Sequence, residues 1–151
     1  MSATTSSAPP LLSPEELGAW RGFLRTHSAL TRELDAELQS EHGLPLVSYE
    51  VLLFLADSPG GRLRMSELAE GVLLSRSGMT RLVDRLVREG LVERERCEGD
   101  ARGLHAVITP RGRRAFSRAR RTHLDGVRRL FLERLSAKEK AQLGEIFARL
   151  G

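Results

Sequence analysis

The feature that most constrains the fold of this chain is a change of hydrophobic periodicity after residue 64. Two helical patterns with a tight turn between them are followed by two extended apolar segments on either side of a polar, glycine-bounded loop. Gly90 ends the second helical pattern. The sequence therefore predicts a helix-turn-helix followed by a β-hairpin, with helices at 65–71 and 75–89 and strands at 91–97 and 104–108.

Longer helical patterns flank this region. Ser13-Pro14-Glu15-Glu16 combines a capping serine, a proline suited to the first helical position and a glutamate that completes a capping box. Thr109-Pro110 and Ser136-Ala137-Lys138-Glu139 are similar helix starts. We expect a mainly α protein with a small β-hairpin, with further helices at 14–41, 46–57, 110–134 and 137–150 and a very short strand around Leu63.

Composition limits the class of protein. A chain of 151 residues with 40% hydrophobic residues can bury a core and is of one-domain size. Its longest apolar run, 51–56, has six residues, whereas a membrane span needs about 18. The Ser/Ala/Pro-rich start lacks the order of a signal peptide, and one cysteine excludes a disulfide framework. We therefore expect a soluble, cytoplasmic protein without cofactors.

Charge is distributed unevenly along the chain. Residues 1–58 contain three arginines and eight acids, whereas residues 103–129 contain eight arginines and one aspartate. Of the 24 basic residues, only Lys138 and Lys140 are lysine. Arginine makes planar bidentate contacts with phosphate and guanine. An arginine bias also arises from genomic base composition, so this observation supports nucleic-acid binding only in combination with others.

The helix predicted at 75–89 has the composition expected of a helix that contacts DNA. Its apolar residues repeat along one side, and its other side carries hydroxyl and guanidinium groups that can donate to phosphates and base edges. A solvated helix face with interleaved arginine and aspartate is the alternative. The candidate DNA contacts in the major groove are Ser75, Arg76, Ser77, Thr80, Arg81 and Arg85.

Several motifs in one order give the chain a family resemblance that covers about residues 13–150. The motifs are Met65-Ser66-Glu67-Leu68-Ala69, the segment 75–86, Gly90-Leu91-Val92, Asp100-Ala101-Arg102 and Ile108-Thr109-Pro110-Arg111-Gly112. In combination they resemble the MarR (multiple antibiotic resistance regulator) family of winged helix-turn-helix proteins. The resemblance implies a homodimeric transcriptional regulator, usually a repressor, that binds a pseudo-palindromic operator and is often released by small ligands, oxidants or metals.

The resemblance also implies a division of the chain. Residues 1–12 are expected to form a flexible arm, and residues 46–109 the winged helix-turn-helix lobe, with the wing at 91–109. Residues 13–45 and 110–151 are expected to form the dimerisation region of what is one compact domain overall.

The predicted wing carries further candidate contacts. Asp100 and Arg102 match the Asp-x-Arg of the family's wing tip, where an arginine can enter a narrow minor groove and the aspartate can orient it. An ordinary turn with a solvated arginine is the alternative. Arg94 and Arg96 are weaker candidates because Glu93, Glu95 and Glu98 offset them, and phosphate contacts by Arg111, Arg113 and Arg114 stay open.

Candidate sensing residues are few. Trp20 and His27 lie on the apolar stripe of the first helix and His123 lies on the helix after the wing, so they can line a pocket for a small aromatic or phenolic ligand. Packing in the core or the dimer seam is the favoured alternative. Cys97 offers a redox-responsive alternative, although the oxidant-sensing relatives carry their cysteine on the first helix.

Other classes of function have little support in the sequence. The Glu41-His42 pair suggests a metal ligand set, but no two histidines stand four residues apart, and we expect no metal site. No phosphate-binding glycine loop, carboxylate pair or nucleophile motif is present, so we expect no enzyme. An architectural DNA-binding protein without an effector stays open as an alternative.

Overall fold

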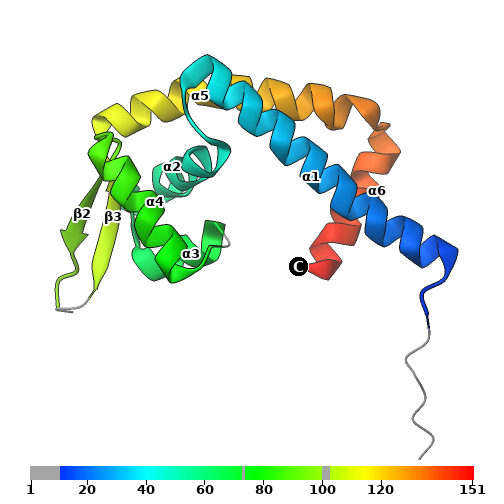
Figure 1. The fold of residues 1–151 in the computed structure, drawn as a ribbon, viewed down its shortest axis with the longest axis horizontal. Coiled ribbons are helices and arrows are strands. Elements are labelled where there is room, and N and C mark those ends of the chain that lie inside the picture. Colours follow the sequence, from blue (N-terminus) through cyan, green and yellow to red (C-terminus); the bar gives the residue numbers. More distant parts are fainter. Residues whose placement is uncertain (1–10, 73, 100–102) are drawn as a thin grey trace, which may run out of the picture.

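The computed structural model describes residues 11–72, 74–99 and 103–151 of the chain. Its helices and strands follow the predicted order (Figure 1). They are α1 (Pro14–His42), α2 (Leu46–Asp57), the 3-10 turn η1 (Pro59–Gly61), β1 (Arg62–Arg64), α3 (Met65–Val72), α4 (Arg76–Arg88), β2 (Val92–Arg96), β3 (Leu104–Ile108), α5 (Pro110–Leu130), the 3-10 turn η2 (Leu132–Arg134) and α6 (Ala137–Leu150).

The core lies in the lobe formed by α2, α3, α4 and a three-stranded antiparallel sheet. The order of strands is β1-β3-β2, and Leu63 pairs with Ala106, so the predicted short strand is confirmed. Leu52, Leu68 and Met79 have no exposed surface and bring the three helices together. Burying a leucine side chain of this kind stabilises a fold by about 2 kcal/mol.

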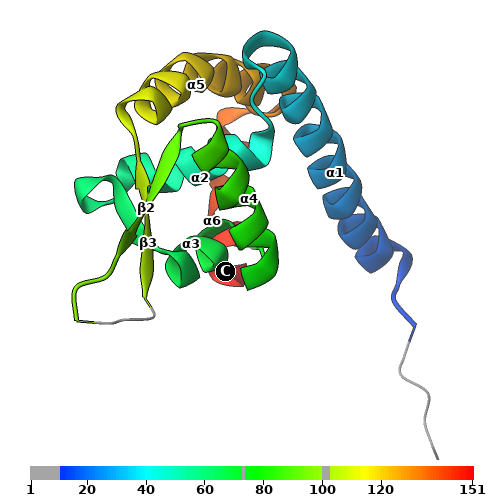
Figure 2. The same cartoon turned by 60° about the vertical axis from the view of Figure 1, so that its left-hand side comes forward.

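Helix α1 belongs to the lobe only at its C-terminal half. Leu34 and Leu38 are buried where α1 crosses α5, whereas the N-terminal half of α1 extends away from the lobe (Figures 1 and 2). Helix α6 has no buried residue. Phe23 of α1 and Phe147 of α6 meet with ring centroids 6.3 Å apart. The two helices therefore expose apolar side chains that do not belong to the core of the lobe.

Local sequence signals set most of the helix ends. The hydroxyls of Ser13, Thr109 and Ser136 cap α1, α5 and α6, and both serines complete the predicted capping boxes. Gly43, with φ of 61°, ends α1 in the left-handed conformation that glycine adopts without steric cost. The prediction for 46–57 is confirmed, and α1 ends one residue later than predicted.

One predicted boundary is wrong. The helix expected over 110–134 ends at Leu130, and Phe131 leaves the helical conformation with φ of −127° and ψ of −61°. The chain continues as a 3-10 turn in which the amide of Leu135 donates to the carbonyl of Leu132 (3.2 Å). Phe131 and Leu132 are apolar and partly buried, so the apolar pattern of the sequence continues across the break and does not reveal it.

Within the described residues, no helix is both long enough and apolar enough to cross a membrane.

Candidate nucleic-acid interface

Helix α4 separates an apolar side from a donor-rich side. Its apolar side is buried in the lobe through Met79, Leu82, Val83 and Leu86. The opposite side exposes Arg76, Ser77, Thr80 and Arg81, which together we call the α4 donor surface. In the part of the chain that the structure describes, neither Arg76 nor Arg81 makes an ion pair. Their guanidinium groups are therefore available to an external acceptor.

Two of the candidate hydroxyls have local partners. Ser75 is the N-cap of α4, and its Oγ accepts from the amide of Gly78 (3.0 Å). The Thr80 hydroxyl donates to the carbonyl of Arg76 (2.9 Å), which fixes its direction. Each of these oxygens can still accept a hydrogen bond, but its existing hydrogen bond fixes the orientation of the side chain. Ser77, whose Oγ lies 3.3 Å from that of Ser75, is the less constrained of the three hydroxyls.

Arg85 is not placed where the sequence analysis expected it. Its Nη2 donates to the Ser48 hydroxyl of α2 (2.9 Å), and Ser48 is completely buried. Arg85 follows Arg76 by nine residues, or about two and a half turns, so it emerges on the other side of the helix. Arg85 therefore holds α4 against α2. A lone serine inside the apolar segment 46–57 was the sequence signal for this contact.

Arg94 of β2 links the predicted wing to α4. Its Nη1 donates to the Asp84 carboxylate and its Nη2 to the carbonyl of Thr80 (3.3 Å). The Arg94 side chain keeps only 26% of its surface exposed. Sequence reasoning gave this arginine little weight because acids flank it, but its partner is on another element. Arg94 thus fixes the hairpin relative to the α4 donor surface.

The wing-tip candidates Asp100 and Arg102 lie outside the described residues. The strands that lead to the tip are described, and they pair from Val92 with Ile108 to Arg96 with Leu104. Both views show this hairpin beside α4 (Figures 1 and 2).

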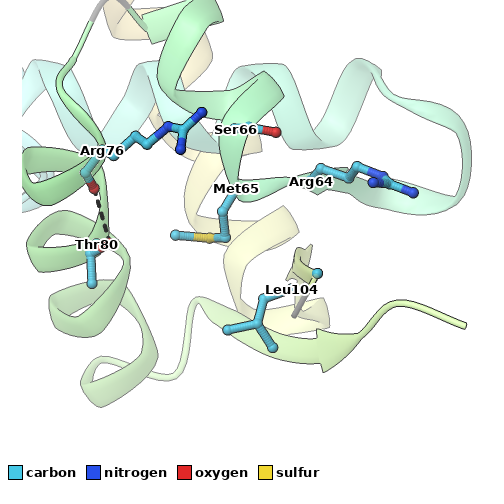
Figure 3. A pocket seen from close by; sticks show the side chains of 7 residues that line it. Arg64, Met65, Ser66, Arg76, Thr80 and Leu104 are labelled. Carbon is cyan, nitrogen blue, oxygen red and sulfur yellow. Dashed lines mark hydrogen bonds between the residues drawn. The ribbon is translucent and has the colours of Figure 1, made fainter. Parts of the chain in front are cut away.

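A hollow of about 360 Å³ lies between α4 and the sheet. Figure 3 shows Arg76 and Thr80 on one side of it, Met65 and Ser66 from the start of α3 on another, and Leu104 of β3 below. Arg64 and Gly103 complete the lining. Arg76 lies at the edge of the hollow. An extended anionic chain that contacted both α4 and the hairpin would cross this hollow. The sequence analysis missed Arg64 and Ser66 because β1 and α3 lie beside α4 only after folding.

Cys97 is buried at the end of β2, and its Sγ lies 3.0 Å from Nδ1 of His105 on β3. A buried thiol reacts slowly with solutes, so this position favours a packing role over the redox alternative.

The three candidate ligand residues lie in two places. Trp20 and His27 flank Phe23 along the exposed side of α1, with ring centroids 6.2 and 6.3 Å from it. The ring of His123 instead packs in a tilted arrangement against Tyr49 of α2, with ring centroids 4.5 Å apart. Among the described residues, no ring contact joins His123 to the α1 group. The tertiary structure therefore does not form one pocket from all three.

Two partly buried groups near these rings have a pKa that is shifted toward the neutral form. Burial lowers the pKa of His123, whose Nδ1 has no hydrogen-bond partner within the described residues. Burial raises the pKa of Glu50 on α2, and the nearby His27 opposes that shift. The described residues include no group of three or more His, Cys, Asp or Glu side chains that could hold a metal ion.

Known proteins resemble this chain over nearly its whole length. The sequence model of the MarR family matches residues 42–103. The HTH-type transcriptional regulator BilQ of Clostridium symbiosum is 30% identical over 116 residues, which are 77% of this chain and 78% of BilQ. The structure of AbsC, a MarR family transcriptional regulator from Streptomyces coelicolor, is 35% identical, with a TM-score of 0.88 over 93% of this chain and 95% of AbsC.

A structure solved in complex with DNA is equally similar. It is Sco3205, a MarR family transcriptional regulator from Streptomyces coelicolor, which is 38% identical with a TM-score of 0.88 over 93% of this chain and 91% of its own. The motifs, the winged helix-turn-helix and these similarities lead to one conclusion: the chain belongs to the MarR family of transcriptional regulators.

Proposed function

We propose that the protein is a homodimeric, ligand-responsive repressor that inserts α4 into the major groove of a pseudo-palindromic operator. The observation that carries the proposal is the α4 donor surface, with Arg76 and Arg81 exposed and without an ion pair among the described residues, beside a hairpin that Arg94 holds in place. Donors of this type discriminate base edges, and an arginine bidentate to guanine contributes about 1–3 kcal/mol. The DNA complex of Sco3205 supports the same role for this chain.

Operator selection from random duplexes, followed by footprinting, tests this function. We expect a two-fold symmetric site whose half-sites are about 34 Å apart, one helical turn of DNA. Arg81→Ala is expected to weaken operator binding about 10- to 100-fold while the fold stays intact. Arg88→Ala is the matched control, because Arg88 is an exposed arginine of the same helix at its far end. Protection without sequence preference would support an architectural protein instead.

The wing has a different expected signature. We propose that Asp100 orients Arg102 toward the minor groove, on the basis of the sequence motif. Arg102→Ala should weaken binding to all sequences to a similar degree and reduce the slope of log affinity against log salt by about one if a phosphate contact is lost. Unchanged affinity and slope would show that the hairpin tip is a solvated turn.

The proposed dimer would use the apolar surface of α1 and α6. Trp20, Phe23 and Leu24 of α1 are 44–55% exposed, and Phe147 and Leu150 of α6 are 46% and 75% exposed. Val127 and Leu130 of α5 are not part of this surface, because they pack on the core of the same chain. Two-fold symmetry would bury the exposed set between subunits and set the spacing of the two α4 helices.

Association is measured by sedimentation and by thermal unfolding at several protein concentrations. We expect a midpoint that rises with concentration, since folding and association are coupled. Removing residues 137–151 should give monomers or aggregates that lose operator binding. Phe147→Lys is a milder variant that should weaken the dimer, whereas Lys140→Ala on the same helix should not. A stable monomer that binds the operator at micromolar concentration would refute the dimer.

We further propose that a small aromatic or phenolic ligand relieves DNA binding by entering beside the rings of α1, at the edge of the proposed dimer interface. Support comes from Trp20, Phe23 and His27, which stack in a row. Trp20 is the single tryptophan, so its emission reports on this surface. A relieving ligand should shift that emission at the concentrations that release DNA. Release without any shift would place the ligand elsewhere.

A further inference from the structure

The first half of α5 carries an arginine surface that the proposed operator contact does not use. Arg111, Arg113, Arg114 and Arg118 are all exposed, and we call them the α5 arginine face. Within the residues that the structure describes, none of the four makes an ion pair. The segment 103–124 contains six arginines and no aspartate or glutamate. The positive charge of this face is therefore not neutralised by the chain itself.

The position of these arginines on the helix is unfavourable for the free protein. The first turn of α5 contains no acidic residue, whereas the first turns of α1 and α6 carry Glu15, Glu16 and Glu139. The amino end of a helix has a partial positive charge, so bound cations there are repelled and anions are stabilised. Arg114 stands three residues after Arg111 and four before Arg118, so it also repels both along one side of the helix. A bound polyanion would relieve both effects.

The arginines also form a surface of definite shape. Arg113, Arg114, Ser117 and Arg118 line a shallow hollow of about 370 Å³. The Arg113 guanidinium lies directly against Gly61, at the site that a Cβ on that glycine would occupy. The lining side chains are three arginines and one serine, whose guanidinium and hydroxyl donors stand above the aliphatic stems of the arginines. These donors suit a phosphate backbone.

The α5 arginine face lies at the opposite end of the lobe from the α4 donor surface. The Thr109 hydroxyl at the start of α5 donates to the carbonyl of Gly90, just past the C-terminal end of α4 (2.7 Å). The two ends of α4 are about 18 Å apart, at about 1.5 Å per residue. Figures 1 and 2 show α2 between α5 and α3, and α2 packs on both. The start of α5 is therefore about one α4 length from the end of α4 that carries Arg76, which favours a second duplex over the one seated on Arg76.

We propose that the α5 arginine face binds the phosphate backbone of a second DNA segment, so that the protein bridges two duplexes. The inference rests on the proposed function only in that the α4 donor surface holds the first duplex. The second contact is independent of sequence, because phosphate contacts carry no base information. It is also steeply dependent on salt, because each neutralised phosphate releases counterions.

A two-duplex capture assay tests the proposal. Operator DNA is fixed to beads in excess over the protein, so that the α4 surfaces are occupied, unbound protein is washed away, and a fluorescent duplex of unrelated sequence is added. We expect retention of the fluorescent duplex at low salt. Arg114→Gln with Arg118→Gln should reduce retention at least tenfold and lower its salt slope by about two, while operator binding is unchanged. If the wild-type protein does not bind the immobilised operator, that result counts against the proposed function instead.

The matched control is Arg121→Gln with Arg128→Gln. It removes the same charge from the same helix, but both arginines contact Asp125 (3.8 and 3.0 Å). Retention by this variant at the wild-type level supports the α5 arginine face. The proposal is overturned if operator-bound wild type retains no second duplex, or if the control loses as much as the test variant. It is also overturned if polyglutamate of equal charge displaces the duplex more effectively than DNA does.

Discussion

Substitution of Gly112 by alanine tests how α5 is held against the junction of α4 and β2. Gly112 is buried in the first turn of α5, and its amide donates to the capping hydroxyl of Thr109 (3.0 Å). A Cβ at this position would lie 2.1 Å from the carbonyl oxygen of Leu91 and 2.9 Å from Cγ1 of Ile108. Close carbon–oxygen contacts in proteins are about 3.3 Å or longer, so α5 must move by about 1 Å.

The expected loss of stability follows from two opposing effects. Overpacking a core usually costs about 1–3 kcal/mol, and here the upper end applies because the clash is with backbone that cannot rotate away. Alanine in place of glycine inside a helix returns about 1 kcal/mol. The net loss is therefore about 2 kcal/mol, which for a chain of this size lowers the melting midpoint by about 4–8 °C.

Thermal unfolding by circular dichroism, at one fixed protein concentration, measures this loss. Gly144→Ala is the matched control, because Gly144 lies inside α6 and a Cβ there meets nothing within 4 Å. It should raise stability by about 1 kcal/mol. If Gly112→Ala is as stable as wild type while the control behaves as expected, then α5 is not held against Leu91 as described, and the reasoning fails.

Further expectations concern the wing, acid stability and α6. Arg94→Met should cost about 1 kcal/mol, and a double-mutant cycle with Asp84→Asn in urea should show that the two changes are not additive; full additivity would contradict the contact. Burial holds the pKa of His123 below its ordinary 6.5, so the unfolded chain gains its proton first and stability falls as pH drops below 6.5. His123→Phe should flatten that fall between pH 7 and 5, and an unchanged pH profile would assign it to other groups. Ser136→Ala removes the hydroxyl that accepts from the Glu139 amide and should lower helix content and stability by about 1 kcal/mol, whereas equal melting curves would show that α6 forms without this cap.

Most of the fold was predictable because its signals are local. Capping boxes, helical periodicity and the alternation of the hairpin act over a few residues, so they specified α1, α4, β2, β3 and α6 with small errors at the ends. The end of α5 was not predictable in this way. Phe131 and Leu132 continue the apolar pattern, and only their packing after the break decides that the helix stops at Leu130.

The candidate site likewise has residues that the sequence was sufficient to find and residues whose roles only packing decided. The exposed positions of Arg76 and Arg81 follow from the periodicity of their own helix, and sequence was sufficient to find them. The role of Arg94 depends on Asp84 and Thr80, which belong to another element. The glutamates beside Arg94 in the sequence suggested that they offset its charge, and they gave no sign of this contact. The ring of His123 lies with Tyr49 and not with Trp20 because helix crossings, not sequence spacing, bring those rings together.

By itself, the sequence determined the order of elements, the donor-rich side of α4 and the family, since these depend on local pattern and composition. The tertiary structure alone decided that Arg85 holds α4 to Ser48, and that α5 begins at the far end of α4 from Arg76. It also decided that the α5 arginine face lies apart from the α4 donor surface. The physical reason is that a side chain's direction is set by its own helix, whereas its partner is set by how helices pack over long separations in the chain.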